Sequence, residues 1–361
     1  MTTPTRTAYD TVVAGAGPAG VMAAYHAAER GPVLLVDAST LPRDKSCGGM
    51  IHGLSRDALA PYGAIPDEIV LEPRYVNFRY VDWDRNVRKP TDLAFLNVDR
   101  AGFDAWLVSL LPDNVEVVGG CAVTGLSQDA SGVRVTLRSE GVELEVSCAN
   151  LVGADGARSA VRRALNVGSA GSYVTLQDYV TLNGEIEPFF DCIYIRSLGD
   201  EFGYGYVMPK GDVAIVGSVF YPKTKRPWEK QDRLLEILRE ALPQLGESVK
   251  REACSALYLR KPADVVPGVG RILLAGEAGG FMSPTSGEGI SYAIRSGILA
   301  GKALAANEPG AVLAAYEVGT LPLRRDIFRR LRWLPFMESR FGKWVGGMTP
   351  TRVVSWITEG L

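Results

Sequence analysis

The sequence predicts an α/β fold in which a Rossmann-type domain is interrupted by a mostly antiparallel β-sheet domain. From Asp10 to Asp37 the pattern is strand, glycine turn, helix and strand, which is typical of a βαβ unit. From Glu72 to Val87 polar and apolar residues alternate, as they do in a half-exposed antiparallel sheet. From Arg271 to Ala306 a strand, a glycine-rich loop and a helix follow one another, so the first domain is expected to be completed late in the chain.

The composition is that of an ordinary globular protein and argues against several classes of function. The formal net charge is -2, which gives no bulk attraction for nucleic acid, so we expect no nucleic-acid partner. The five cysteines have no CxxC spacing, which speaks against a disulfide framework or zinc site and favours a reducing, cytoplasmic setting. We see no signal peptide and no run of about 18 apolar residues, so a spanning helix is not expected. Attachment to a membrane surface stays open.

The remaining segments divide between the two domains and a tail. A helix is predicted over 100–111 and a polar helix over 228–242, with short strands between and after them. The predicted strands lie at 115–118, 133–137, 144–146, 151–153 and, through several turns, from 173 to 221. We therefore expect a nucleotide domain of residues 1–70, 92–168 and 255–320, a sheet domain of 71–91 and 169–254, and a C-terminal helical tail of 321–361.

The first glycine turn, Gly15 to Gly20, fits the pattern GxGxxG between a strand and a helix. Gly15 permits the tight turn, Gly17 lets the backbone approach a pyrophosphate, and Gly20 allows close helix packing. The start of the helix then faces the phosphates, and Asp37, at the end of the second strand, can accept hydrogen bonds from an adenosine ribose. This unit predicts dinucleotide binding, but it does not separate FAD from NAD.

Further motifs of the chain resemble those of a known flavoprotein family. Asp99-Arg100, Gly153-Ala154-Asp155-Gly156 and the segments Gly276 to Gly279 and Gly287 to Gly289 follow the first motif in the order typical of that family. The family is p-hydroxybenzoate hydroxylase-like and contains aromatic hydroxylases and geranylgeranyl reductases. The resemblance implies an FAD cofactor, contact between Arg100 and FAD, and a place for Asp155-Gly156 near the flavin phosphates.

Two details of the flavin half qualify the resemblance. Glu277 stands where the family has aspartate, so the carboxylate expected to take a ribityl hydroxyl is one methylene longer. The loop from Pro284 to Gly289 brings N–H groups to the start of a helix, where they would stabilise negative charge on reduced flavin. The predicted FAD-binding residues are Gly15, Gly17, Pro18, Ala19, Gly20, Asp37, Ala38, Lys45, Cys47, Gly48, Arg100, Val123, Asp155, Gly156, Gly276, Glu277, Gly287, Glu288, Gly289 and Ile290.

Two segments resemble the geranylgeranyl reductase branch in particular. Lys45-Ser46-Cys47-Gly48-Gly49 is similar to its Cys-Gly-Gly loop, and Tyr204 to Gly211 is similar to its YxWxFPKG motif, with Tyr206 for Trp and Met208 for Phe. By period-two alternation Tyr204, Tyr206 and Met208 share one face of a strand and could line an apolar substrate cavity. Together with Pro209 they are the predicted substrate-binding residues, and the alternative is that they fill the core between the two domains.

The candidate catalytic residues are Cys47, Tyr206 and His52. In the family the cysteine matching Cys47 sits near the flavin, and Lys45 and Arg43 could lower its pKa, although cysteine is also a common buried hydrophobe. No cysteine follows Cys254, so no catalytic disulfide is predicted. His52 is a candidate acid, with an ordinary loop histidine as the alternative. Because the chain has two histidines, neither a catalytic triad nor a histidine-rich metal site is expected.

The C-terminal tail combines basic and aromatic residues, a composition suited to an anionic lipid interface. The alternative is a pair of helices that is broken at Pro335 and packs on the body with a solvated basic face. The residues concerned are Arg324, Arg325, Arg329, Arg330, Arg332, Arg340 and Lys343 with Leu331, Trp333, Leu334, Phe336, Phe341, Trp344 and Trp356.

These observations predict an FAD-dependent oxidoreductase that reduces or dehydrogenates a carbon–carbon bond of a small apolar, isoprenoid-type substrate by hydride transfer at flavin N5. The alternatives are an NAD(P)H-dependent aromatic hydroxylase, a flavin-dependent halogenase suggested by the likeness of Tyr204 to Pro209 to WxWxIP, and a flavin-binding sensor or peripheral-membrane scaffold. The electron donor is expected to be NAD(P)H or a reduced ferredoxin-like protein. The sequence carries no signal for the oligomeric state.

Overall fold

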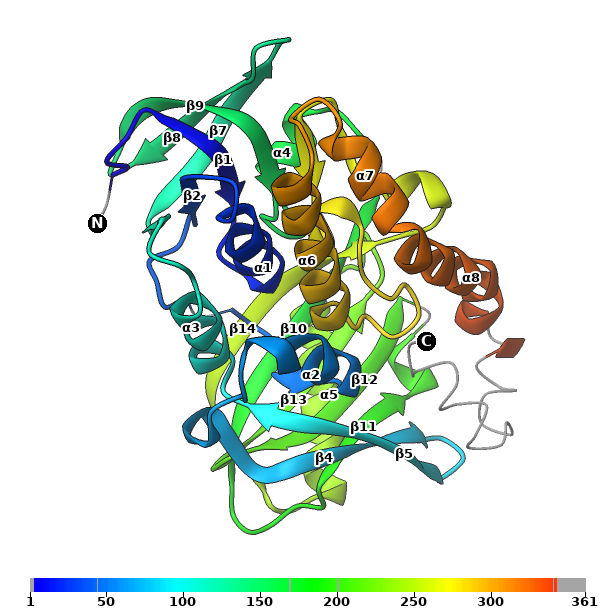
Figure 1. Cartoon of the computed structure of the whole chain (residues 1–361). Coiled ribbons are helices and arrows are strands. Elements are labelled where there is room, and N and C mark those ends of the chain that lie inside the picture. The colour runs from blue at the N-terminus through cyan, green and yellow to red at the C-terminus, as the bar shows by residue number, and fades with distance from the viewer. Residues whose placement is uncertain (1–2, 44, 169, 200, 340, 343–361) are drawn as a thin grey trace.

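The protein is built on two large sheets joined by helices, seen here in a computed structural model (Figure 1). The structure describes residues 3–43, 45–168, 170–199, 201–339 and 341–342. The first sheet contains β1 (Ala8–Ala14), β2 (Val33–Val36), β6 (Val115–Val118), β7 (Cys121–Gln128), β8 (Val133–Ser139), β9 (Val142–Gly153), β15 (Gly268–Val269) and β16 (Ile272–Leu274). Its central order is β15-β16-β9-β1-β2-β6, and the strands from β16 to β6 run parallel.

The second sheet is mostly antiparallel. It contains β3 (Met50–Ile51), β4 (Val70–Asp82), β5 (Val87–Val98), β10 (Gly171–Leu182), β11 (Phe189–Tyr194), β12 (Phe202–Lys210), β13 (Val213–Phe220) and β14 (Leu245–Tyr258). The order is β14-β10-β13-β12-β11-β4-β5-β3, and only the β4–β11 pair among these neighbours is parallel. The predicted architecture of a Rossmann-type domain with an inserted antiparallel sheet is therefore present.

Sheet membership differs from the predicted division in two places. The border at residues 91 and 92 falls inside β5, which stays in the second sheet through Val98, where it pairs with Val70. The strand β14 follows the helix over 227–241 and was not predicted. Its exposed and buried residues alternate irregularly, so the sequence does not show the two-residue period of a strand there. The predicted strands at 144–146 and 151–153 are one strand, β9, whose first part pairs with β8 and whose last part lies beside β1.

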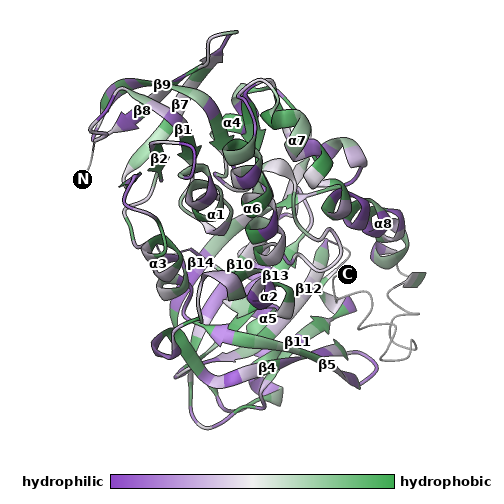
Figure 2. Ribbon diagram, viewed as in Figure 1, coloured by the Kyte–Doolittle hydropathy of each residue, from purple (hydrophilic) through white to green (hydrophobic). Residues whose placement is uncertain are grey.

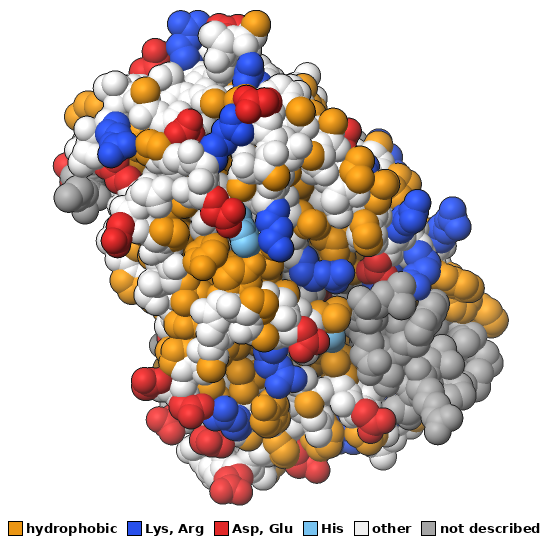
Figure 3. All heavy atoms as spheres, viewed as in Figure 1, with side chains coloured by type: hydrophobic (Ala, Val, Ile, Leu, Met, Phe, Trp, Pro, Cys, Tyr) orange, Lys and Arg blue, Asp and Glu red, His pale blue; other side chains and the backbone are white. Residues whose placement is uncertain are grey.

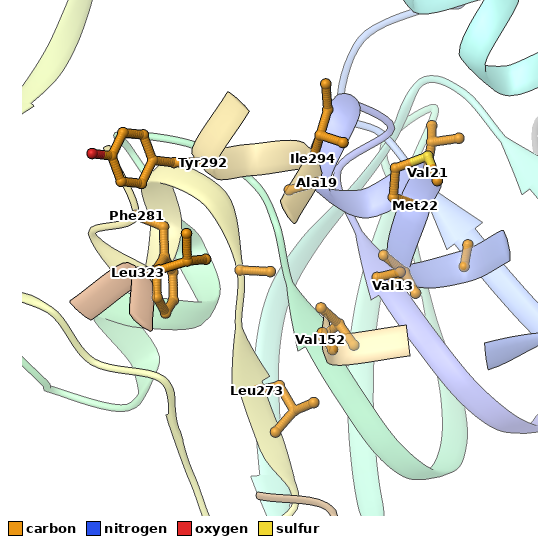
Figure 4. Packing of buried hydrophobic residues seen from close by; sticks show 14 of the residues in the cluster. Val13, Ala19, Val21, Met22, Val152, Leu273, Phe281, Tyr292, Ile294 and Leu323 are labelled. Atoms are coloured by element: carbon orange, nitrogen blue, oxygen red, sulfur yellow. The ribbon is translucent and has the colours of Figure 1, made fainter. Parts of the chain in front are cut away.

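Eight α-helices cover the sheets. They are α1 (Pro18–Ala27), α2 (Gly53–Leu59), α3 (Arg100–Ser109), α4 (Ala160–Ala164), α5 (Pro227–Ala241), α6 (Ile290–Ala306), α7 (Val312–Gly319) and α8 (Leu321–Glu338) among the described residues. The largest core cluster joins β1, β9 and β16 to α1, α6 and α8, through residues such as Val13, Met22, Val152, Leu273 and Leu323 (Figure 4). Strongly hydrophobic residues run along β1 and β2, whereas α8 carries many hydrophilic ones (Figure 2).

The two central helices of the nucleotide domain, α1 and α6, pack closely because glycine stands where they meet. A Cβ on Gly297 of α6 would lie 2.2 Å from the carbonyl oxygen of Ala19 in α1. A Cβ on Gly20 would lie 1.8 Å from the carbonyl oxygen of Gly15, so Gly20 has the packing role that the motif predicts. These contacts bring the first and the last segments of the domain together.

The helix α8 does not break at Pro335, contrary to the sequence-based expectation. Proline removes one backbone hydrogen bond and clashes with the preceding turn, at a cost of about 3 kcal/mol. Here Leu331 and Leu334, in the turn before the proline, are buried in the main core cluster, and Glu338 after it is bound to Arg260 and Tyr258. These contacts hold the helix to Glu338. The tail residues Arg340, Lys343, Trp344 and Trp356 lie outside the described residues. No helix in the described part of the chain is long and apolar enough to cross a bilayer.

The contact between α1 and α6 can be tested with Gly297→Ala. Alanine favours a helix by about 1 kcal/mol over glycine, but here its Cβ meets backbone atoms that cannot rotate away, and overpacking of this kind costs about 1–3 kcal/mol. We expect a lower free energy of unfolding in urea titration. Gly310→Ala is the control, since nothing lies within 4 Å of its Cβ, and it should change the stability by less than about 0.5 kcal/mol. Equal stability of the two variants would contradict the packing argument.

Candidate cofactor and substrate site

A cavity of about 1000 Å³ is lined by residues of both sheets and their connecting loops. This volume is at the upper end of the range for small-molecule sites. Every cofactor-binding and substrate-binding residue predicted from the sequence lines it, except Gly20 and Pro209. The candidate catalytic residues Cys47, His52 and Tyr206 line it as well. The fold thus brings together segments that are more than 200 residues apart in the chain.

The two exceptions have simple geometric causes. Gly20 faces the glycine turn and fills the space where α1 meets β1. Pro209 lies next to Met208 on β12, and side chains alternate along a strand, so its ring points away from the cavity face. The carbonyl oxygen of Pro209 accepts a hydrogen bond from the side chain of Asn97. Pro209 therefore does not line the cavity, contrary to its predicted place in the substrate site.

The glycine turn and Asp37 form one unit at one end of the cavity. Gly15 has φ +103°, a conformation that glycine adopts without strain. Asp37 is buried, and its carboxylate accepts hydrogen bonds from the backbone N–H groups of Ala16 and Ser39, both at 2.8 Å. The carboxylate thus fixes the turn in addition to facing the space where a ribose would lie.

Arg43 is a cationic residue of this end that sequence reasoning did not assign to the cofactor. Its guanidinium lies 3.6 Å from the carboxylate of Asp37 and 2.9 Å from that of Asp104. A Cβ on Gly17 would lie 2.4 Å from its Nη2, so the guanidinium is directly over the glycine turn. No local motif marks Arg43, because the loop that carries it reaches the turn only in the folded chain.

The residues at this end fit a dinucleotide such as FAD. The helix α1 begins at the glycine turn, where the first N–H groups of a helix have no intrahelical partner, and the guanidinium of Arg43 over the turn offers a counter-charge for a diphosphate. In addition, the Oδ1 atom of Asp155 is buried and has no hydrogen-bond partner among the described residues, while Oδ2 accepts from the N–H groups of Ala160 and Val161. A hydroxyl group of a bound ligand would satisfy Oδ1, and a buried unpaired carboxylate oxygen is otherwise costly.

The residues expected at the flavin half have mixed roles. One carboxylate oxygen of Glu277 accepts a hydrogen bond from the backbone N–H of Leu257 at 2.8 Å, so the longer side chain ties the nucleotide domain to β14. Glu288 accepts from both the N–H and the hydroxyl of Ser291, which stabilises the first turn of α6. Within the preceding loop, Gly287 donates to the carbonyl of Ser283. In the first turn of α6 the N–H of Ser291 is thus taken by Glu288, and a ligand would meet the other N–H groups of this helix start.

The loop around Cys47 is held against β12 by a buried lysine. Lys210 donates hydrogen bonds to the carbonyl oxygens of Gly48 at 2.7 Å and Val98 at 2.5 Å and to the side-chain oxygen of Asn97 at 3.0 Å. Burial lowers the pKa of Lys210 to about 8. Gly49 has φ +63°, and a Cβ there would lie 2.4 Å from the lysine nitrogen, so the loop needs glycine at this turn. Lys210 is the lysine of the segment that resembles YxWxFPKG, and its role in positioning the loop was not predicted.

The pKa of the Cys47 thiol is lowered although the thiol is buried. Burial alone would raise its pKa, but the Arg100 guanidinium, the N–H of Gly49 and the Lys45 ammonium together bring the pKa below its usual value. Arg100 itself is buried and paired with Asp104 at 2.9 Å. Cys254 lines the same cavity, and burial raises the pKa of its thiol. The arrangement therefore makes Cys47 the more reactive of the two thiols.

The predicted aromatic wall lies on one face of β12. Tyr204, Tyr206 and Met208 all line the cavity, whereas Val207 points to the other face, where it packs with the leucines of α5. The ring of Tyr206 lies over Gly217, where a Cβ would approach it to 2.1 Å. The hydroxyl of Tyr206 accepts a hydrogen bond from Gln177, which in turn accepts one from Ser46 beside Cys47. The wall and the Cys47 loop are thus one connected structure.

His52 has a structural role at the edge of the cavity. Its Nδ1 accepts a hydrogen bond at 3.0 Å from the N–H of Leu54 and so caps the start of α2. The ring is buried and packs edge-on against Phe95. Protonation of Nδ1 would remove this cap. This geometry favours the alternative that His52 is an ordinary loop histidine with a structural role. Its role as an acid stays a prediction.

Comparison with known proteins agrees with this geometry. Residues 112–328 match the family model described as FAD binding domain. Protein CbrA from Escherichia coli O9:H4 (strain HS) is 29% identical over 337 residues, which are 90% of this chain and 88% of CbrA. A geranylgeranyl bacteriochlorophyll reductase-like protein from Thermoplasma acidophilum has a TM-score of 0.82 at 20% identity, over 98% of this chain and 92% of that one. The flavin-dependent brominase Bmp2 has a TM-score of 0.77 at 19% identity, over 97% of this chain and 92% of that one.

The fold class predicted from the sequence is confirmed by these matches. FAD as the cofactor is likewise confirmed by the family match. At such low identities the solved structures establish the fold and leave the reaction open.

The acidity of Cys47 can be measured by alkylation. We expect iodoacetamide to modify Cys47 at lower pH than Cys254, because Arg100 and Lys45 stabilise the Cys47 thiolate while burial disfavours that of Cys254. Peptide mass spectrometry across neutral to alkaline pH gives both rate profiles in one sample. Lys45→Gln should move the Cys47 profile to higher pH and leave that of Cys254 closer to wild type. Coinciding profiles for the two thiols would show that the cationic neighbours have no such effect.

The positioning role of Lys210 can be tested with Lys210→Met. The substitution removes the Nζ donor from the carbonyl oxygens of Gly48 and Val98 and from Oδ1 of Asn97, and an unsatisfied buried acceptor costs about 1–3 kcal/mol. We expect a lower free energy of unfolding and a lower ratio of FAD to protein after gel filtration, since the Cys47 loop is released. Lys225→Met, on the exposed surface, is the matched control and should leave both unchanged. Wild-type FAD retention in Lys210→Met would argue that the loop is held by other contacts.

Proposed function

Because this chain belongs to the FAD binding domain family of flavoproteins, we propose that it is an FAD-dependent oxidoreductase that reduces, or in reverse dehydrogenates, a carbon–carbon bond of an apolar, isoprenoid-type substrate. The observation that carries the proposal is the continuous wall of Tyr204, Tyr206 and Met208 next to the Cys47 loop, within the cavity that also holds the dinucleotide-binding residues. An apolar chain that lies against this wall would remove apolar surface from water on both sides, which favours binding.

The two domains contribute different side chains to the cavity. Loops and the start of α3 in the nucleotide domain supply the cationic residues Arg43, Lys45, Arg100 and Arg158, of which Arg43 lies over the glycine turn and suits the diphosphate of FAD. Strands of the second sheet supply the apolar residues Phe78, Leu93, Phe95, Phe190, Tyr204 and Met208. One cavity therefore combines cationic and apolar lining, as a flavin enzyme with a hydrophobic substrate requires.

Bound FAD would supply hydride transfer at its N5 position. The residues of this chain contribute binding and orientation: the glycine turn and Asp37 hold the adenosine half, and the N–H groups that begin α6 face the flavin half. The aromatic wall excludes water and places the double bond of the substrate. The hydrogen bonds from Ser46 to Gln177 and from Gln177 to Tyr206 fix the wall relative to the Cys47 loop.

The comparisons support a flavin enzyme and are compatible with more than one reaction. The similarity to a geranylgeranyl bacteriochlorophyll reductase-like protein extends over nearly the whole of both chains. That to a flavin-dependent brominase is almost as extensive, so halogenation, like aromatic hydroxylation, is treated as an outcome of the test. We propose NAD(P)H or a reduced ferredoxin-like protein as the electron donor, and bleaching of the flavin absorbance by each purified donor distinguishes them.

The direct test is anaerobic incubation of the reduced, FAD-loaded protein with prenyl alcohols and prenyl diphosphates. We expect flavin reoxidation together with a product that is two hydrogens heavier, detected by mass spectrometry. A fully saturated analogue is the control and should leave the flavin reduced. Flavin reoxidation without gain of two hydrogens would sink the proposal. A product with one added oxygen that needs O₂ would favour a hydroxylase, a halide-dependent product a halogenase, and no turnover with any acceptor a flavin-binding sensor or scaffold.

A further inference from the structure

Exposed aromatic side chains gather on the outer face of α8 and just after its end. Trp333 is 54% exposed, Phe336 is 41% exposed and Phe341 is 63% exposed. The rings of Trp333 and Phe336 are 6.4 Å apart, and those of Phe336 and Phe341 are 6.2 Å apart, both edge to face. They form a single cluster, which we call the aromatic patch. Large exposed apolar groups that adjoin one another mark an interaction surface more often than isolated ones do.

The same helix is strongly basic. The residues Leu321 to Glu338 include five arginines against two carboxylates, although the whole chain has a net charge of -2. Arg329 and Arg330 pair with Asp326, whereas Arg325 and Arg332 are exposed and make no ion pair with the residues that the structure describes. Basic side chains gather over α8, with apolar side chains beyond them at the border of the grey region (Figure 3). The partner of this face is therefore expected to be both anionic and apolar.

The inner face of α8 packs against the core, and its last turn lines the cavity. Leu323, Ile327, Leu331 and Leu334 are buried at helical spacing against the core. In the last turn, Leu334, Met337 and Glu338 line the cavity. Glu338 pairs with Arg260 at 2.7 Å and accepts a hydrogen bond from the hydroxyl of Tyr258 at 3.0 Å, so this turn is fixed to the second sheet. One turn of helix thus separates the cavity from the aromatic patch.

We propose that the outer face of α8 docks on the surface of an anionic lipid bilayer. Tryptophan and phenylalanine enter the headgroup region, while arginines pair with lipid phosphates, which is the arrangement of an interfacial amphipathic helix. Docking would bring the cavity next to the bilayer, where an apolar substrate is dissolved. The purpose of the docking rests on the proposed function, but the docking itself rests on the aromatic patch and the unpaired charge of Arg325 and Arg332.

The test is co-sedimentation of the full-length, FAD-loaded protein with vesicles, without any substrate. We expect binding to vesicles of phosphatidylglycerol and phosphatidylcholine, weaker binding to phosphatidylcholine alone, and weakening by salt. The double substitution Arg325→Glu/Arg332→Glu should reduce partitioning by roughly tenfold or more, and Trp333→Ala/Phe336→Ala should reduce it to a similar degree. Arg233→Glu on α5 and Val249→Ala on β14, both exposed, are the matched controls and should bind as wild type does.

FAD absorbance and circular dichroism verify that each variant is folded. Quenching of tryptophan fluorescence by lipids with brominated acyl chains, lost in Trp333→Phe, would place this side chain in the bilayer. Equal vesicle binding of wild type and Trp333→Ala/Phe336→Ala would overturn the proposal, as would self-association that this variant abolishes in the absence of vesicle binding. Because no turnover is measured, failure of the reductase assay and failure of docking are separate results.

Discussion

The structure depends on the close approach of α1 and α6 at Ala19. Gly297 of α6 leaves room for the carbonyl oxygen of Ala19, and Gly276, whose Cβ would lie 2.8 Å from the Cβ of Ala19, leaves room for its side chain. The N–H of Gly276 donates to the hydroxyl of Ser296 and so fixes the loop to α6. These contacts join segments that begin and complete the nucleotide domain. With larger residues at these positions, the glycine turn and the loop before α6 would not share one cavity.

The second sheet is attached to this frame by polar contacts at the cavity wall. Lys210 donates a hydrogen bond to Gly48 in the Cys47 loop. Gln177 joins Ser46 to Tyr206 by two hydrogen bonds. Glu277 of the nucleotide domain accepts a hydrogen bond from Leu257 of the second sheet. Each contact uses a buried donor or acceptor, and such groups are costly to leave unpaired. They therefore fix the relative position of the thiol and the aromatic wall more sharply than apolar packing alone would.

The helix α8 connects the cavity with the surface. Its buried leucines are part of the main core, its last turn lines the cavity, and its outer face carries the aromatic patch. The packing of Leu331 and Leu334 also explains why the helix continues past Pro335. The side chains of α8 therefore lie in three environments, the core, the cavity and the outer surface. In the sequence this helix shows only a mixture of basic and apolar residues.

The sequence by itself determined the features that depend on local backbone geometry or on residue spacing. The βαβ unit, the turn at Gly15, the place of Asp37 at the end of the second strand and the common face of Tyr204, Tyr206 and Met208 were all predicted, because a turn and a strand have fixed periods. The distant cofactor motifs were identified through their resemblance to a flavoprotein family. Nearly all of these residues meet in one cavity, as that resemblance implies.

Only the tertiary structure decided which residues from distant segments support the site. Arg43 lies over Gly17, Lys210 anchors the Cys47 loop, and β14 completes the second sheet, but none of these contacts has a local signal. The continuation of α8 past Pro335 and the role of His52 as a helix cap depend on the neighbours that the fold supplies. Proline inside a helix costs about 3 kcal/mol, and the burial of two leucines, at about 1.5–3 kcal/mol each, outweighs that local cost.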